Sequence, residues 1–217
     1  MTSERLAKLR TVVARRQPDL TVLMENVHKP HNFSAVMRTC DAVGALNAHA
    51  VVRNELRVNT ANTSSADKWV RVGKHAGVAD AIQHLRSSGH KVMAAHLSPR
   101  AIDFRAHDFT KPTAVLLGQE LYGVTDEALA LCDGEVVVPM LGLIASLNVS
   151  VAAAVILYEA QRQREAAGMY AKAQLSDEAQ RDLIFEYLHP IIAEKKGKPY
   201  PLIDEEGHIV YKGNAGW

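Results

Sequence analysis

The sequence contains few cysteines and no long apolar segment, and these two absences narrow the class of protein. Cys40 and Cys132 are the only thiols in 217 residues, which is too few for a disulfide framework and is typical of a reducing compartment. No run reaches the roughly 18 apolar residues of a membrane span, and residues 1–10 lack the apolar core of a secretory signal. We therefore expect a cytoplasmic protein without a membrane segment and with both thiols buried.

The usual glycine motifs for nucleotides are also missing. No Gly-x-Gly occurs, which excludes the dinucleotide fingerprint and the glycine loop of the common methyltransferase fold. Gly118 and Gly123 are spaced as in a phosphate-binding loop, but Val124 follows where that loop needs a lysine. No His-x-x-x-His or Cys-x-x-Cys pair offers a metal site, so we expect none.

The composition is that of an ordinary globular protein with a locally uneven charge. Hydrophobic residues make up 47% and charged residues 23% of the chain, and the net charge is +1. Five basic residues precede residue 17, against one acid, and a second basic cluster lies near the C-terminus: Arg5, Lys8, Arg10, Arg15 and Arg16, then Lys195, Lys196 and Lys198. Such clusters either form solvated helix faces or neutralise nucleic-acid phosphates.

Segments rich in β-formers alternate with helical segments along most of the chain. The predicted strands are 21–26, 48–53, 69–73, 91–96, 113–118 and 135–138, and the predicted helices are one around Arg38, then 78–87, 125–131, 146–167 and 177–188. This order predicts an α/β fold with a mainly parallel sheet covered by helices on both faces. Beyond Gly168 the chain becomes polar, with Ser176 as a helix N-cap and a loop around Pro199 and Pro201.

The helix around Arg38 has one apolar face, which does not include the arginine. The stripe has the helical period and consists of Phe33, Val36, Met37 and Cys40. Asn32 and Ser34 can cap the first turn, and Gly44 supplies a stop. By pattern alone, Arg38 is either a solvated partner of Asp41 or a ligand-binding residue.

Two loops at strand ends have unusual compositions. Parallel sheets bind ligands at the carboxyl ends of their strands. Glu120 follows an apolar strand and is flanked by glycines that permit close approach of backbone to a ligand, although such a sequence is also found in ordinary turns. The second loop is apolar from Pro139 onward. Apolar surface is unfavourable in water, so we expect this loop to cover another surface. It leads to Ser146 and Asn148, either of which can also cap the following helix.

Three segments together resemble the motifs of the SpoU, or TrmH, family of RNA ribose 2′-O-methyltransferases. They are 26–44, 116–123 and 138–159, and the resemblance covers about residues 20–165. The flanks 14–20, 158–164 and 167–170 resemble the branch that methylates a guanosine at position 18 in the tRNA D-loop. The resemblance implies S-adenosylmethionine as methyl donor and a homodimer with composite active sites. It also implies a SPOUT fold with a C-terminal trefoil knot, which periodicity alone does not predict.

The resemblance also assigns roles to individual residues. Arg38 matches the arginine that engages the phosphate and ribose of the target nucleotide, and the other polar motif positions match Asn32, Glu120, Ser146 and Asn148. The cofactor's adenosyl group is placed around the backbone of Ala95, Gly118, Val138 and Leu147. A guanidinium stays protonated at working pH, so we expect Arg38 to act as an electrostatic clamp and Glu120 to be structural rather than the base.

The family resemblance also predicts three domains. They are a basic N-terminal helix in residues 1–19 that contacts tRNA, a methyltransferase domain in 20–167 and a helical extension in 168–217. Two alternatives remain: a family member acting on ribosomal RNA or on another tRNA site, and an RNA-binding module without catalysis. The lack of a large N-terminal RNA-binding domain argues against ribosomal RNA, and the intact polar motifs argue against the inactive module.

Overall fold

A computed structural model describes residues 3–51 and 68–210 and divides the chain into two compact units. The larger unit is Gln17–Met169, and the smaller one combines Met1–Arg16 with Tyr170–Trp217. The N-terminal helix therefore shares a unit with the C-terminal segment. The functional division into residues 1–19, 20–167 and 168–217 stays a prediction.

The larger unit is built on a seven-stranded sheet in which every pairing is parallel. The strand order is β3-β2-β1-β6-β4-β7-β5. The strands are β1 (Leu20–Glu25), β2 (Asn47–Val51), β3 (Arg71–His75), β4 (Lys91–Ala95), β5 (Ile102–Asp103), β6 (Thr113–Leu117) and β7 (Gly134–Val137). The prediction of a parallel sheet is confirmed. β5 was not predicted, β3 begins two residues later than expected, and the predicted end of β2 at 52–53 lies outside the described residues.

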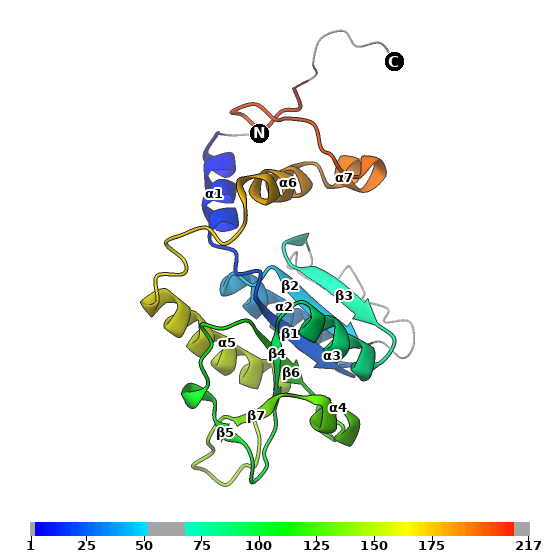
Figure 1. The fold of residues 1–217 in the computed structure, drawn as a ribbon, viewed down its shortest axis with the longest axis vertical. Helices are drawn as coiled ribbons and strands as arrows, with labels where there is room; N and C mark the ends of the chain where they lie inside the picture. The colour runs from blue at the N-terminus through cyan, green and yellow to red at the C-terminus, as the bar shows by residue number, and fades with distance from the viewer. Residues whose placement is uncertain (1–2, 52–67, 211–217) are drawn as a thin grey trace. The chain divides into compact units, whose positions relative to one another are not determined.

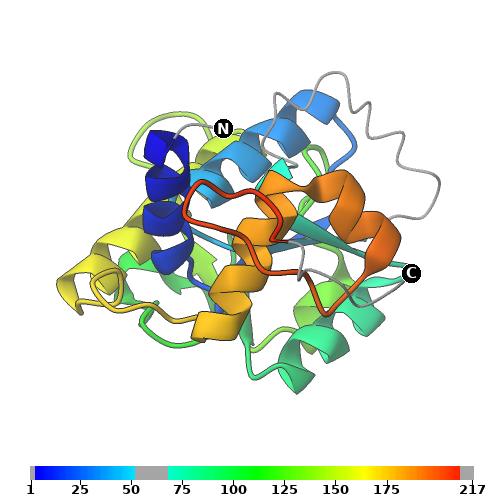
Figure 2. The same ribbon diagram turned by 90° about the horizontal axis from the view of Figure 1, so that it is seen from above.

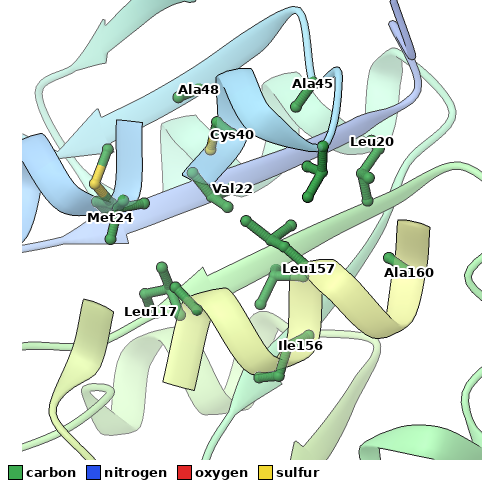
Figure 3. Packing of buried hydrophobic residues seen from close by; sticks show 14 of the residues in the cluster. Leu20, Val22, Met24, Cys40, Ala45, Ala48, Leu117, Ile156, Leu157 and Ala160 are labelled. Carbon is green, nitrogen blue, oxygen red and sulfur yellow. The ribbon is translucent and has the colours of Figure 1, made fainter. Parts of the chain in front are cut away.

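Helices cover both faces of this sheet, as predicted (Figure 1). α2 (Pro30–Ala42) and α5 (Val149–Ala166) pack on one face, and α3 (Val78–Ser87) and α4 (Asp126–Leu131) pack on the other. Figure 3 shows strand residues such as Val22 and Leu117 meeting Leu157 from α5. Burying each such side chain contributes about 1.5–3 kcal/mol. A sheet covered on both faces explains why its central strands are apolar throughout.

The start of α2 differs from the predicted capping. Pro30 occupies the first turn, and Lys29 is the N-cap without a side-chain hydrogen bond. Proline suits this position because its fixed φ is helical and its missing N–H would have had no partner there. Asn32 and Ser34 are buried inside the helix, so their predicted capping role is wrong. Gly44 follows the helix with φ 82° and is confirmed as the stop.

α5 begins three residues later than the predicted start at Ser146. Asn148 is its N-cap, and the Asn148 side chain accepts a hydrogen bond from the Ser150 backbone N–H at 2.9 Å. This confirms one of the two predicted caps. The residues before Asn148 remain a loop that joins β7 to the helix.

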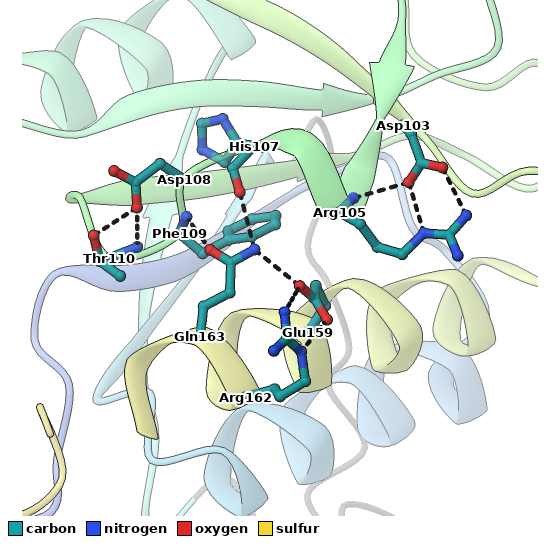
Figure 4. Close-up of polar contacts among 9 residues, drawn as sticks. All are labelled: Asp103, Arg105, His107, Asp108, Phe109, Thr110, Glu159, Arg162 and Gln163. Atoms are coloured by element: carbon teal, nitrogen blue, oxygen red, sulfur yellow. Dashed lines mark hydrogen bonds and ion pairs between the residues drawn. The ribbon is translucent and has the colours of Figure 1, made fainter. Parts of the chain in front are cut away.

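The far end of α5 is fixed to the segment before β6 by polar side chains. Gln163 donates to the carbonyl of His107 at 3.1 Å and accepts from the Phe109 N–H at 2.9 Å (Figure 4). Arg164 is fully buried and donates to the Asp19 carboxylate at 2.5 Å and to the Phe109 carbonyl at 2.8 Å. These contacts join the last turns of α5 to the start of β1.

The smaller unit contains α1 (Ser3–Ala14), α6 (Asp177–Leu188) and α7 (Pro190–Lys196). α1 and α6 lie side by side (Figure 2), with Leu6 and Val13 buried on α1 and Leu183 and Phe185 buried on α6. Ser176 is confirmed as the N-cap of α6, since its hydroxyl accepts from the Ala179 N–H. α7 was not predicted.

The cysteines are less alike than expected. Cys40 is buried on α2, but Cys132 after α4 is only half-buried, and its thiol donates to the Leu129 carbonyl. None of the helices in the described parts of the chain is both long enough and apolar enough to span a membrane.

Candidate active site

Three polar side chains from distant parts of the sequence meet at the carboxyl end of the sheet. Glu120 follows β6, Asn32 lies in the first turn of α2, and Asn148 caps α5. The Asn32 side-chain amide donates to Glu120 Oε1 at 2.6 Å, and the Asn148 amide donates to Asn32 Oδ1 at 3.2 Å. Asn32 is thereby held by both neighbours. The structure brings together three of the five predicted catalytic residues in one hydrogen-bonded chain.

Glu120 is held in its charged form. Burial raises the pKa of this carboxyl, but the hydrogen bond from Asn32 and the nearby charge of Lys29 outweigh burial, so the pKa lies below its ordinary value. A carboxylate with a lowered pKa is a weak base. Glu120 is therefore better suited to orienting Asn32 than to removing a proton.

A cavity of about 610 Å³ lies beside these residues. Its walls come from the carboxyl ends of β4, β6 and β7, the loops that follow them and the start of α5. The four predicted cofactor-binding residues all line it: Ala95, Gly118, Val138 and Leu147. This volume is typical of a site for a small organic ligand. Ser146 is exposed in the loop and also lines the cavity.

Gly118 is required by its own turn. A Cβ at Gly118 would lie 2.2 Å from the carbonyl carbon of Gly123 and 2.3 Å from the Val124 nitrogen. Gln119 and Gly123 exchange two backbone hydrogen bonds of 3.1 and 3.0 Å, and Gly123 has φ 69°. Backbone thus fills the space where a Gly118 side chain would lie. The expectation that these glycines permit close approach to a ligand stays a prediction.

The sequence did not predict that Glu25 supports the same turn. Glu25 is buried at the end of β1 and accepts from the Thr125 hydroxyl at 2.6 Å and from the Thr125 N–H at 3.1 Å. Thr125 is also the N-cap of α4. Together they anchor the chain just beyond Gly123. The available signal was an acidic residue closing an otherwise apolar strand.

Arg38 lies apart from the cavity of its own chain. Its side chain is exposed on α2, and it does not line the cavity. Arg38 follows Asn32 by six residues, which is about 9 Å along a helix and on a different side of it. Within the described residues Arg38 makes no ion pair, so of the two alternatives the pair with Asp41 is not seen.

The loops around the cavity expose apolar side chains. The exposed residues belong to the turn after β6 and to the loop before α5, and they are Leu121, Tyr122, Leu141, Leu143 and Ile144. We call this set the apolar rim. Exposed apolar side chains concentrated on two loops are typical of an interaction site.

The predicted tRNA contacts on the N-terminal helix and the segment after it differ in exposure. The exposed residues are Arg5, Lys8, Arg10 and Arg15. Arg16 is only 1% exposed, with its guanidinium 3.3 Å from the Tyr187 hydroxyl and over the Tyr187 ring. The structure therefore corrects the prediction for Arg16, because a buried guanidinium does not meet RNA at the surface.

In the residues that the structure describes, no group of three or more His, Cys, Asp or Glu side chains is arranged to hold a metal ion. The absence of a metal requirement stays a prediction.

The sequence matches a known family over most of its length. The model of the SpoU rRNA methylase family matches residues 19–158, and the model of the SpoU rRNA methylase C-terminal region matches residues 162–212. The chain belongs to the SpoU methylase family. Asn32, Glu120 and Asn148, which were assigned to the family's motifs from the sequence, meet at the end of the sheet.

Similar proteins include several tRNA (guanosine(18)-2′-O)-methyltransferases. The one from Escherichia coli is 47% identical over all of this chain and 96% of its own length, and the one from Thermus thermophilus is 52% identical over 86% and 97%. The crystal structure of the Aquifex aeolicus TrmH/SpoU tRNA modifying enzyme is 41% identical, with a TM-score of 0.79 over 85% of this chain and 94% of that chain.

A second solved structure is a cofactor complex. The SpoU methyltransferase AviRb from Streptomyces viridochromogenes, in complex with the cofactor AdoMet, is 29% identical, with a TM-score of 0.60 over 70% of this chain and 60% of that chain. The SPOUT-type α/β architecture of this SpoU family member is thus shared with its relatives. The predicted trefoil knot stays a prediction.

Proposed function

We propose that this SpoU family member transfers a methyl group from S-adenosylmethionine to the 2′-hydroxyl of guanosine 18 in tRNA. The observation that carries the proposal is the hydrogen-bonded chain of Glu120, Asn32 and Asn148 beside a ligand-sized cavity. Relatives with 41–52% identity over most of this chain have that activity in their names, which supports the choice of tRNA. The AdoMet complex of a family member supports the methyl donor.

The residues at the cavity fit the methyl donor. Ala95, Gly118 and Val138 offer backbone groups at strand ends, and Leu147 offers backbone and apolar surface. An apolar wall with a few convergent polar groups suits an adenine ring. S-adenosylmethionine supplies an activated methyl group whose leaving group is a neutral thioether, so the protein need not supply an acid there.

The protein's own task is to position the ribose hydroxyl and to favour loss of its proton. In this proposal the Arg38 guanidinium holds a substrate phosphate and stabilises negative charge developing on the 2′-oxygen. Glu120 keeps Asn32 oriented through their 2.6 Å hydrogen bond. Ser146 and Asn148 complete the polar side of the site at the start of α5. The proton passes to a substrate phosphate or to water.

The active form is a homodimer in this proposal. Arg38 does not line its own cavity, and the apolar rim beside that cavity is exposed in a single chain. Pairing two chains through the rim would cover it and would let Arg38 act in the site of the partner subunit. A stable interface of this kind buries about 1,600 Å² in total.

The N-terminal helix and the residue after it supply further contacts to tRNA. Arg5, Lys8, Arg10 and Arg15 are exposed, and each basic contact to a phosphate releases condensed counterions and strengthens binding. The proposal also includes a cytoplasmic location, a trefoil knot in the C-terminal half of the methyltransferase domain and catalysis without a metal.

The direct test is transfer of labelled methyl to an unmodified tRNA transcript, followed by mapping of the modified nucleotide. We expect label on the ribose of guanosine 18, and a loss of at least about 100-fold in Arg38→Ala. Arg38→Lys should also lose most activity, because lysine keeps the charge but not the bidentate geometry. Arg86→Ala, on the far side of the sheet with Asp133 as partner, is the matched control and should retain activity.

Other results would change the assignment. Label at another tRNA nucleotide would overturn the position but not the chemistry. Label on ribosomal RNA alone would overturn the tRNA substrate. Binding of S-adenosylmethionine without transfer to any RNA would indicate the inactive RNA-binding module.

A further inference from the structure

A buried carboxylate ties the segment after β4 to the neighbouring strand. Glu135 lies in β7, and 4% of its side chain is exposed. Its two oxygens accept from the Ser98 hydroxyl and from the Arg100 guanidinium, the latter at 2.5 Å. Ser98 Oγ also accepts from the Arg100 N–H at 3.1 Å, which closes a tight turn. One carboxylate thus holds both ends of that turn.

This segment is a wall of the proposed cofactor cavity. His96 and Leu97 line the cavity from one side, and 136–138, directly after Glu135, line it from the other. The backbone N–H of His96 donates to the Val136 carbonyl at 3.0 Å. Glu135 itself does not line the cavity. Its side chain therefore sits where the two walls are joined.

Few other contacts fix the turn. Within the described residues, the hydrogen bonds that join positions 97–100 to the sheet are the two made to Glu135, and Leu97 is exposed. The hydrogen bond from Ser98 and the charge of Arg100 outweigh burial and hold the pKa of Glu135 below its ordinary value. A buried charge of this kind requires its partners, so the turn and the carboxylate fix each other.

We propose that Glu135 is a positioning residue for the methyl donor: by holding Ser98 and Arg100, it keeps the segment 96–101 in place as a wall of the cofactor cavity. The inference rests on the proposed cofactor site and extends it to a residue that does not touch the ligand. It separates Glu135 from Asn32, Glu120 and Asn148, which the proposed function assigns to the RNA ribose. Its effect is therefore on cofactor affinity.

The test measures cofactor binding directly, with the full chain and no RNA. Titration calorimetry with S-adenosylmethionine should give a Kd about tenfold higher for Glu135→Gln, the usual consequence of losing one charge-assisted hydrogen bond. Ser98→Ala removes one of the two bonds and should raise Kd by a smaller factor, about threefold. Glu127→Gln, on the exposed face of α4, is the matched control and should bind as the wild type does.

Kinetics and melting separate positioning from general stability. We expect KM for S-adenosylmethionine to rise with Kd in Glu135→Gln while kcat at saturation stays within about twofold. Unchanged Kd in Glu135→Gln that melts as a folded protein would overturn the inference, and so would a fall in kcat at unchanged KM. If Glu135→Gln does not fold, Ser98→Ala decides by the same criterion. Failure of the wild type to bind S-adenosylmethionine would overturn the proposed function as well.

Discussion

Gly118 illustrates how a single residue can be fixed by its neighbours' backbone. Its missing side chain leaves room for the carbonyl of Gly123, which returns antiparallel to it within the same short turn. That turn supplies one wall of the cavity and positions Glu120. The glycine is therefore a condition for the local geometry from which the site is built.

We predict that Gly118→Ala abolishes the shape of this turn. The added Cβ has no space at 2.2 Å from backbone, so the turn must open. Affinity for S-adenosylmethionine should fall by at least about tenfold, and the melting temperature should drop. Gly77→Ala is the control, because a Cβ there meets only the Asp80 carboxylate at an ordinary 3.6 Å. Wild-type affinity in Gly118→Ala would contradict this account of the turn.

His49 is a residue whose protonation state depends on folding. It is buried on β2, with Nδ1 2.9 Å from Nε2 of His75 and with the ring of His84 nearby. Burial, and then the charges of His75, His84 and His90, lower the pKa of His49 to about 4. The unfolded chain takes up this proton near pH 6.5, whereas the folded chain does not.

This difference predicts a loss of stability in mild acid. The contribution of neutral His49 is complete above pH 6.5 and is lost as pH falls toward 4. We therefore compare the free energy of unfolding at about pH 7.5 and about pH 5.5. Between these two pH values the wild type should lose more of it than His49→Gln does, by at most about 1 kcal/mol. His31→Gln, exposed on α2, is the control. An equal loss in the wild type and in His49→Gln would contradict the prediction.

At the scale of elements, the last turns of α5 are fixed by one buried arginine. Arg164 donates to the Asp19 carboxylate and to the backbone carbonyls of Phe109 and Lys111. Without this buried guanidinium, the carboxylate and carbonyl oxygens would lose their hydrogen-bond donor, which destabilises the folded state. α5 also carries Asn148 at its other end, so the same helix links the site to the start of β1.

We predict that Arg164→Met destabilises the protein by about 3 kcal/mol, the usual cost of breaking a buried ion pair from one side. Arg162→Met is a matched control on the same helix, because Arg162 is exposed and its ion pair in the described part of the chain is with Glu159. Its cost should stay below about 1 kcal/mol. Denaturant unfolding measures both values, and equal costs would show that the Arg164 network does not stabilise the native state.

Elements with a strong local pattern were predictable from the sequence. Apolar runs bounded by turn residues predicted all strands but β5, and Asn148 and Ser176 marked helix starts by their side-chain chemistry. β5 has two residues and exists only by pairing with β7. α7 follows α6 directly at Pro190, and its seven residues are too few to show a helical period. These elements depend on tertiary contacts that no local window contains.

The site was predictable only in part. The positions of Glu120 and Asn148 after predicted strands indicated that they are site residues. The family resemblance indicated the same for Asn32 and Arg38. The supporting acids Glu25 and Glu135 were missed, because a single glutamate in an apolar strand does not indicate which partner it meets. Their partners, Thr125 for the first and Ser98 for the second, lie on segments that meet them only after folding.

At the scale of the whole molecule, the apolar rim and the position of Arg38 lead to one prediction. Leu143→Glu places a charge in the apolar rim, the proposed dimer contact, where Leu143 is fully exposed in a single chain. The variant should sediment as a monomer and lose methyl transfer, since Arg38 no longer reaches a partner's site. Leu202→Glu, exposed in the smaller unit, should remain dimeric. A monomeric wild type with full activity would contradict the dimer.

The measurement that tests the central claim most directly compares two tRNAs that differ by one atom. One carries guanosine at position 18 and the other carries 2′-deoxyguanosine there, and both are incubated with the wild-type chain and labelled S-adenosylmethionine. The proposed activity predicts stoichiometric label on the first tRNA and none on the second, because the acceptor oxygen is missing. Equal labelling of both would show that the methyl group goes elsewhere and would contradict the proposed function.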